Sequence, residues 1–178
     1  MKLELLRRDI KRYGQVNKLI SFLTNPMFRY TVIFRLNQSA SRWNPLFVPL
    51  RIWYKNLSVK YSIQIPVYTK IGGGFLLGHY GGILIGQRVI IGENCNVYQG
   101  VSIGNTSRGK SKGFPTIGDR VWIGANSVVV GKITIGNDVL IAPLSFVSFD
   151  VPDNAVVAGN PAQIVSYNSS AGYIKNPS

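Results

Sequence analysis

A small aliphatic residue recurs every six positions from Ile65 to Val147. The row reads Ile65, Ile71, Leu77, Ile85, Ile91, Val97, Ile103, Ile117, Ile123, Val129, Ile135, Ile141 and Val147. Eight of these residues are followed directly by Gly. A helix spaces its apolar residues three and four apart and a strand spaces them two apart, so a period of six fits neither alone. The row predicts a coil of three short faces, with one aliphatic side chain per face directed to the axis.

The period breaks at two places. Leu77 and Ile85 are eight positions apart, and the two extra residues lie within segment 78–82, which holds three glycines. Ile103 and Ile117 are fourteen positions apart, and the surplus is the Gly- and Lys-rich run 105–114. Insertions in a solenoid leave one face as loops. We therefore expect a rim of loops around His79, the single histidine of the chain.

His79 is the candidate general base. It lies among glycines that permit close approach of a substrate, and a neutral imidazole near pH 7 suits proton abstraction. A lone histidine is more often structural, but its position at a break in the repeat favours catalysis. No metal site is expected, because the chain has one histidine, and Cys95 has no CxxC partner. No GxSxG or Walker sequence occurs.

The first 62 residues predict three helices that form a small α-helical cap. The expected helices are Leu3–Tyr13, with an apolar stripe and basic residues opposite, a second from Asn25-Pro26, and a third from Leu46 to about Lys60 that follows Asn44-Pro45. Residues 63–165 form the expected β-helix, and the polar tail 166–178 is expected to be frayed.

The basic charge is concentrated in residues 1–62. They hold twelve Lys and Arg against two acidic residues, which accounts for +10 of the net charge of +13. One interpretation is a lid over the open end of the repeat. The other is contact with the inner face of an anionic membrane. The chain shows no nucleic-acid recognition motif and no signal peptide pattern, so we expect a cytoplasmic protein without a nucleic-acid partner.

Three segments carry a resemblance to a known family. They are Leu77–Ile83, Tyr98–Gly104 and Gly159–Ala162 within the repeat. Together they resemble the hexapeptide-repeat acyltransferases, most closely the serine acetyltransferase branch, over about residues 62–165. The resemblance implies a left-handed parallel β-helix, a homotrimer, acetyl-CoA as co-substrate, and a site between neighbouring subunits. It also implies that His79 takes the proton from an acceptor hydroxyl as that hydroxyl attacks the thioester.

The chain departs from the serine acetyltransferase pattern at positions that matter for serine. Gln64 replaces the Asp that orients the histidine, and Gly78, Gly113 and Phe114 replace groups that help bind serine. Gln163 replaces the Arg that commonly ends the C-terminal motif. We therefore expect a sugar hydroxyl in capsule or lipopolysaccharide synthesis as the acceptor, since shorter sugar O-acetyltransferases also resemble this chain.

Two alternatives stay open: serine O-acetylation for cysteine synthesis, and a non-catalytic β-helix scaffold trimer. For catalysis, the resemblance implies His79 with Gln64. It implies acceptor contacts at Gly78, Tyr80 and Phe114. Contacts to acetyl-CoA are expected at Gln99, Gly104, Asn105, Arg108, Lys110, Lys112, Ala125, Ala142 and Pro161.

Overall fold

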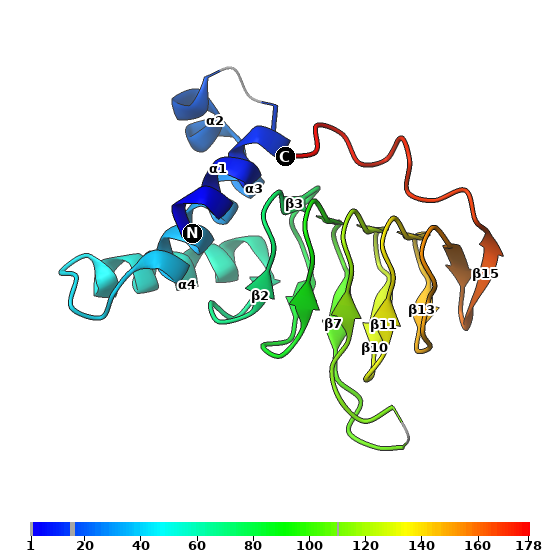
Figure 1. Ribbon diagram of the computed structural model, residues 1–178. Coiled ribbons are helices and arrows are strands. Elements are labelled where there is room, and N and C mark those ends of the chain that lie inside the picture. The colour runs from blue at the N-terminus through cyan, green and yellow to red at the C-terminus, as the bar shows by residue number, and fades with distance from the viewer. Residues whose placement is uncertain (1, 15–16, 110) are drawn as a thin grey trace.

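The repeat folds into a parallel β-helix whose short strands lie in three sheets (Figure 1). The computed structural model describes residues 2–14, 17–109 and 111–178. Sheet 1 contains β1 (Ile63–Gln64), β4 (Ile83–Ile85), β7 (Ser102–Gly104), β10 (Val128–Val130) and β13 (Phe146–Val147). Sheet 2 contains β2 (Lys70–Ile71), β5 (Ile90–Ile91), β8 (Thr116–Ile117) and β11 (Thr134–Ile135). Sheet 3 contains β3 (Leu76–Leu77), β6 (Asn96–Val97), β9 (Trp122–Ile123), β12 (Leu140–Ile141), β14 (Val156–Gly159) and the antiparallel β15 (Ala162–Ser166).

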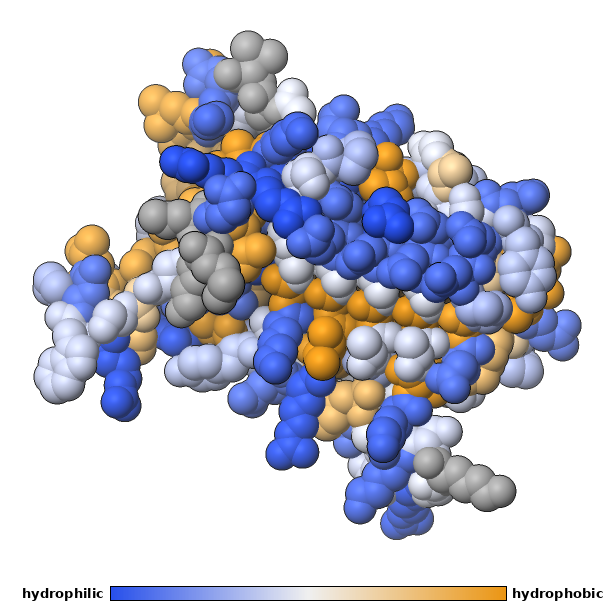
Figure 2. All heavy atoms as spheres, viewed as in Figure 1, coloured by the Kyte–Doolittle hydropathy of each residue, from blue (hydrophilic) through white to orange (hydrophobic). Residues whose placement is uncertain are grey.

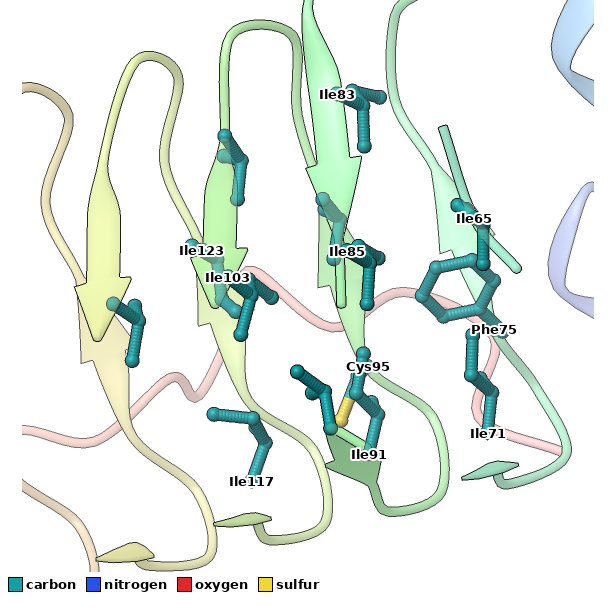
Figure 3. Packing of buried hydrophobic residues seen from close by; sticks show 14 of the residues in the cluster. Ile65, Ile71, Phe75, Ile83, Ile85, Ile91, Cys95, Ile103, Ile117 and Ile123 are labelled. Carbon is teal, nitrogen blue, oxygen red and sulfur yellow. The ribbon is translucent and has the colours of Figure 1, made fainter. Parts of the chain in front are cut away.

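The interior of the solenoid confirms the six-residue row. All thirteen positions are buried, and none is more than 5 % exposed. The prediction of one inward side chain per face was wrong, because the residue two positions earlier also points inward. Phe75, Ile83 and Cys95 belong to this second row and are buried like Leu77, Ile85 and Val97. Ile83 and Ile85 of β4 show the two inward positions (Figure 3). Alternate residues of an extended chain lie on the same side, so each short face contributes two side chains to the core.

Among the described residues before the solenoid there are four helices, one more than expected. They are α1 (Lys2–Arg12), α2 (Lys18–Thr24), α3 (Pro26–Ser39) and α4 (Phe47–Tyr61). The expected start of α3 is confirmed, since the Asn25 side chain accepts from the backbone N–H groups of Met27 and Phe28. The Asn44 side chain instead accepts from Leu46 N–H in a turn, so α4 begins after it. The helices lie at the β1 end of the solenoid (Figure 1). Their action as a lid stays a prediction, as does the division into domains.

A buried ion pair joins α1 to α3 and to the solenoid. Arg35 Nε donates to Asp9 Oδ2 over 2.7 Å, and both side chains are 1 % exposed. Arg35 also donates to the carbonyls of Ile71 and Gly72, and Asp9 accepts from Phe75 N–H. Arg12 of α1 is also buried, at 2 % exposure, so the expectation that the basic residues of this helix lie opposite its packed face was wrong for Arg12. Desolvation makes such burial costly, and the paired charges offset that cost.

The outer surface of the helices carries exposed apolar side chains. Leu19, Ile20 and Leu23 of α2 are 57–69 % exposed, and this part of the surface is visibly hydrophobic (Figure 2). Trp43, in the turn before α4, is 92 % exposed. None of the helices in the described part of the chain is long and apolar enough to cross a bilayer.

The C-terminal tail is packed, in contrast to the frayed tail that we expected. It runs back along the solenoid from β15 to α1 (Figure 1). Ser170 donates from its backbone N–H to the carbonyl of Asp138 and from its hydroxyl to that of Arg120. At the end of the tail, Arg8 donates to the carbonyl of Ser178. These partners are dispersed along the chain, so a local sequence pattern does not reveal them.

Candidate functional site

His79 lies at the corner between β3 and β4, where the chain passes from sheet 3 to sheet 1. Gly81 and Gly82 hold this corner with φ of 106° and 68°, a conformation that favours glycine. The Gly81 N–H donates to the carbonyl of Tyr61 at the end of α4, and the Gly81 carbonyl accepts from Gly100 on the next coil. The corner is therefore fixed on both sides, while His79 itself is exposed.

Gly78, expected at the acceptor site, has a packing role in this structure. A Cβ at this position would overlap the ring of Tyr98. The absence of that atom lets the Tyr98 ring lie beside His79, with the two ring centroids 6.3 Å apart. Tyr80, also expected to contact the acceptor, is 57 % exposed and its ring packs against Tyr61.

An aromatic row continues from Tyr98 to the C-terminal tail. The Tyr98 and Trp122 centroids are 4.9 Å apart, and those of Trp122 and Tyr173 are 5.2 Å apart. Aromatic pairs at these separations stabilise each other by about 0.5–1.5 kcal/mol beyond their buried area. The tail thus contributes the outer member of a row that ends beside His79.

A small pocket of about 270 Å³ lies beside His79, between the helices and sheet 3. It is lined by Arg12, Tyr13, Asn25, Met27, Leu76, Leu77, Gly78, His79 and Tyr98. Arg12 donates to the carbonyls of Gly74 and Lys175 and to the side chain of Asn96. Burial lowers the pKa of the Arg12 guanidinium from its ordinary value, yet it remains a cation at neutral pH because an arginine is not deprotonated in proteins.

Sequence reasoning missed the helical residues of this pocket. Arg12 and Tyr13 come from the end of α1 and the following turn, and Asn25 comes from the N-cap of α3. The Asn25 cap was recognisable from the following proline, but its place beside His79 was not. Arg12 gave no signal, because a helical pattern assigns a charged residue to the solvent face.

Gln64 lies in a different groove from His79. That groove, of about 580 Å³, runs between α4 and sheet 1, and Lys55, Val59, Gln64, Leu84 and Ser102 contribute to its lining. Gln64 is exposed on β1. No hydrogen bond joins Gln64 to His79 within the described part of the chain. The two residues thus line different pockets, and their pairing stays a prediction.

The inserted loop after β7 projects from the opposite edge of sheet 1. Gly104 ends β7, and Asn105, Arg108 and Lys112 are exposed at positions beyond it. Lys110, the third expected basic residue, lies outside the described residues. The loop closes on itself through a bridge between Thr106 and Gly113.

Phe114, expected at the acceptor site, packs at the base of this loop. Its ring occupies the space where a Cβ on Gly86 would lie, at 2.9 Å, and it contacts the hydrophobic core. In a single chain, this places Phe114 at the edge of sheet 1 that is opposite to the His79 corner.

The remaining expected cofactor contacts follow the His79 edge. Gln99, Ala125 and Ala142 lie at successive corners between sheet 3 and sheet 1, linked by backbone bonds such as Asn126 N–H to the Gln99 carbonyl. Pro161 lies in the turn between β14 and β15. The Gln99 side-chain oxygen is buried and has no hydrogen-bond partner among the residues that the structure describes.

The electrostatic character of the site is basic. Arg12 is the charged residue among those lining the His79 pocket. Within residues 2–14, 17–109 and 111–178, no three His, Cys, Asp or Glu side chains gather as metal ligands would. The arrangement can accept a proton at His79 and attract an anionic group at Arg12.

Comparison with known proteins supports the resemblance. Residues 114–148 match the family described as "Bacterial transferase hexapeptide (six repeats)". The serine acetyltransferase of Bacillus subtilis is 40 % identical over 107 residues, which is 60 % of this chain and 49 % of that protein. Serine acetyltransferase 4 of Arabidopsis thaliana is 36 % identical over 111 residues, which is 62 % of this chain and 31 % of that protein. The chain spans between 31 % and 50 % of the length of the first curated relatives that it matches.

Solved structures agree with the sequence comparisons. The serine acetyltransferase of Neisseria gonorrhoeae in complex with serine matches with a TM-score of 0.73 at 27 % identity, over 93 % of this chain and 69 % of that one. The enzyme of Brucella abortus in complex with coenzyme A matches with a TM-score of 0.74 at 26 % identity, over 92 % and 67 %. These structures imply the left-handed sense of the parallel β-helix, and the resemblance to serine acetyltransferase-like hexapeptide acyltransferases is confirmed.

The same findings overturn the prediction of a sugar acceptor. These relatives and solved structures are named serine acetyltransferases, and they do not support a role in surface polysaccharide synthesis. The prediction was wrong because it relied on the substitutions at Gln64, Gly78, Gly113, Phe114 and Gln163 and on the likeness to shorter sugar O-acetyltransferases. It did not anticipate the Arg12 guanidinium, a cation suited to a carboxylate, which the helices bring beside His79.

Proposed function

We propose that this protein is an acetyl-CoA-dependent O-acetyltransferase that acetylates the hydroxyl of serine. The observation that carries the proposal is the His79 corner, placed beside a pocket with a buried guanidinium, in a chain similar to serine acetyltransferases.

The proposed reaction needs one proton carrier. A ring nitrogen of His79 accepts the proton of the serine hydroxyl as the oxygen attacks the thioester carbonyl carbon. The C–S bond then breaks, O-acetylserine forms, and the protonated His79 returns the proton to the leaving thiolate of coenzyme A. A positioned general base contributes about 10²- to 10⁴-fold to such a step.

Arg12 is suited to hold the serine carboxylate. A guanidinium has five N–H donors, and the described residues accept from three of its nitrogens, with one bond from each. Each of the two terminal nitrogens therefore retains one N–H for a carboxylate. Charge-assisted bonds of this kind are roughly twice as strong as neutral ones.

Acetyl-CoA is proposed to use the corners that bear Gln99, Ala125 and Ala142, with Arg108 and Lys112 meeting its phosphates. In one chain, these corners and the two basic residues lie at opposite edges of sheet 1. The three-residue strand between the edges spans about 10 Å, at about 3.3 Å per residue. We therefore propose a homotrimer in which the loop of one chain serves the His79 edge of its neighbour.

The activity is tested by the release of coenzyme A thiol from acetyl-CoA in the presence of L-serine. L-alanine, which lacks the hydroxyl, is the matched control acceptor, and mass spectrometry identifies O-acetylserine. His79→Ala is expected to lower kcat by at least about a hundredfold while leaving the KM for acetyl-CoA nearly unchanged. Thiol release that is equally fast with serine and alanine would refute the serine acceptor.

The shared site is tested by mixing two impaired variants. One carries His79→Ala, and the other carries Arg108→Glu with Lys112→Glu, which we expect to raise the KM for acetyl-CoA because the phosphates lie far from the reacting carbonyl. Co-refolded mixtures should regain activity if each site takes its base from one chain and its loop from another. A mixture no more active than its parts, or a monomer in light scattering, would exclude the trimeric site.

Membrane contact of the helices stays a prediction that rests on their charge and exposed apolar residues. It should weaken as salt screens the surface charges. Failure to co-sediment with anionic vesicles at low ionic strength would leave only the lid interpretation.

A further inference from the structure

The amide oxygen of Gln99 is buried without a donor in the part of the chain that the structure describes. A buried acceptor that lacks a hydrogen bond is costly, so native proteins seldom leave one unpaired. Gln99 lies at the corner between β6 and β7, next to the His79 corner on the preceding coil. The orphaned oxygen therefore indicates a donor that comes from the site.

His79 occupies the position on the neighbouring coil that matches Gln99. Leu77 pairs with Val97, so His79 and Gln99 each lie two residues beyond a paired position. The Gly100 N–H donates to the Gly81 carbonyl, which keeps the two corners aligned. Adjacent strands are about 4.8 Å apart, a separation that a glutamine side chain can bridge to an imidazole.

Neither ring nitrogen of His79 has a hydrogen-bond partner among the described residues, although its ring is placed beside Tyr98. Gln64, the residue that the family pattern pairs with the histidine, lines the separate groove against α4. A catalytic histidine needs one ring N–H held, because that bond fixes the tautomer and leaves the other nitrogen free to act as base.

We infer that Gln99 is a positioning residue whose amide oxygen accepts the ring N–H of His79 and so fixes the basic tautomer. The inference rests on the proposed role of His79 in acetyl transfer. The titratable groups that line the pocket with His79 are Arg12 and Tyr13 from the α1 end, and Tyr98 from the corner after β6. None of them is a carboxylate, so a neutral amide sets the tautomer without adding charge.

The single histidine makes the inference directly measurable, because His79 supplies the one imidazole signal in an NMR titration of the full chain. Gln99→Glu replaces the neutral acceptor by a carboxylate and should raise the titration midpoint of His79 by about one pH unit, as a nearby opposite charge does. Gln64→Glu tests the rival position, and Gln87→Glu, on an exposed corner residue, is the matched charge control.

Gln99→Met removes the acceptor at similar volume. It should shift the tautomer ratio of His79, which is measured by the ¹⁵N chemical shifts of the ring. It should also lower kcat at least about tenfold, because a wrong tautomer disables the base. Activity measurements on Gln99→Glu should show the same upward shift in the pH profile as the NMR titration.

Equal His79 titration midpoints in Gln99→Glu and Gln87→Glu would overturn the inference. A shifted His79 midpoint in Gln64→Glu alone would assign the positioning role to Gln64. If Gln99→Glu does not fold, an unchanged tautomer ratio in Gln99→Met overturns it instead. The NMR readout needs no substrate, so a shifted midpoint in a protein that fails to acetylate serine would reject the acceptor and retain the positioning role.

Discussion

Removal of the Arg35 guanidinium should destabilise the whole helical segment. Arg35→Met leaves the Asp9 carboxylate buried at 1 % exposure without its partner, and it leaves the Ile71 and Gly72 carbonyls without a donor. Breaking a buried pair from one side costs about 3–5 kcal/mol. A chain of this size loses about 2–4 °C of Tm per kcal/mol, so we expect a fall of roughly 10 °C.

The loss of stability in Arg35→Met should depend on pH in a defined direction. Burial raises the pKa of the Asp9 carboxyl, and Arg35 opposes that rise. Without Arg35, the folded-state pKa of Asp9 lies further above its unfolded value of about 3.9. The penalty is thus small at pH 4, where the carboxyl can be protonated in both states, and grows as pH rises through the folded-state pKa.

Two variants make the test specific to burial. Arg120→Met breaks a pair with Asp138 that has the same 2.7 Å distance but is 42 % and 32 % exposed, so it should cost at most about 1 kcal/mol. The double variant Asp9→Leu with Arg35→Met removes both charges and should regain most of the lost stability. Urea unfolding at fixed protein concentration measures all three. An Arg35→Met loss no larger than that of Arg120→Met would refute the reasoning.

Three further predictions concern residues around the site. Burial raises the pKa of the Cys95 thiol to about 12, so Cys95 should resist alkylation at pH 8 in the folded protein and react within minutes after unfolding; reaction of the native protein at the unfolded rate would contradict its burial. Tyr173→Ala should cost about 1 kcal/mol through its lost ring contact, whereas Tyr167→Ala, at 63 % exposure in the same tail, should change the unfolding free energy by less than about 0.5 kcal/mol. Gly78→Ala should lower kcat, because the added Cβ displaces the Tyr98 ring from its place beside His79. An unchanged kcat would show that Tyr98 does not contribute to the site.

The solenoid could be predicted from the sequence because its interior repeats. A side chain at each sixth position sees the same environment on every coil, so the pattern records the fold directly. The break at segment 78–82 likewise marked His79, since an insertion has to leave the solenoid. The second inward row was harder to find, because it mixes Phe75, Cys95 and Thr69 with aliphatic residues and so has no uniform composition.

The helical side of the site could not be predicted in the same way. Asp9 and Arg35 are 26 positions apart and lie on different helices, so no local pattern shows that they neutralise each other. The same holds for Arg12, whose partners at Gly74, Asn96 and Lys175 are 62 to 163 positions away. A periodicity argument places such charges in water because it cannot see the pairing that makes their burial tolerable.

Two of the substitutions that argued against serine have a packing role in the folded chain. Phe114 fills the space over Gly86, and Gly78 makes room for the Tyr98 ring. Both residues therefore have packing reasons that do not depend on the acceptor. We therefore expect the acceptor to be determined by the residues that line the His79 pocket. One of them is Arg12 of α1, and the Asp9–Arg35 pair anchors this helix to α3. If Arg12 holds the serine carboxylate as proposed, a variant that loosens α1 should weaken the binding of serine before it affects acetyl-CoA.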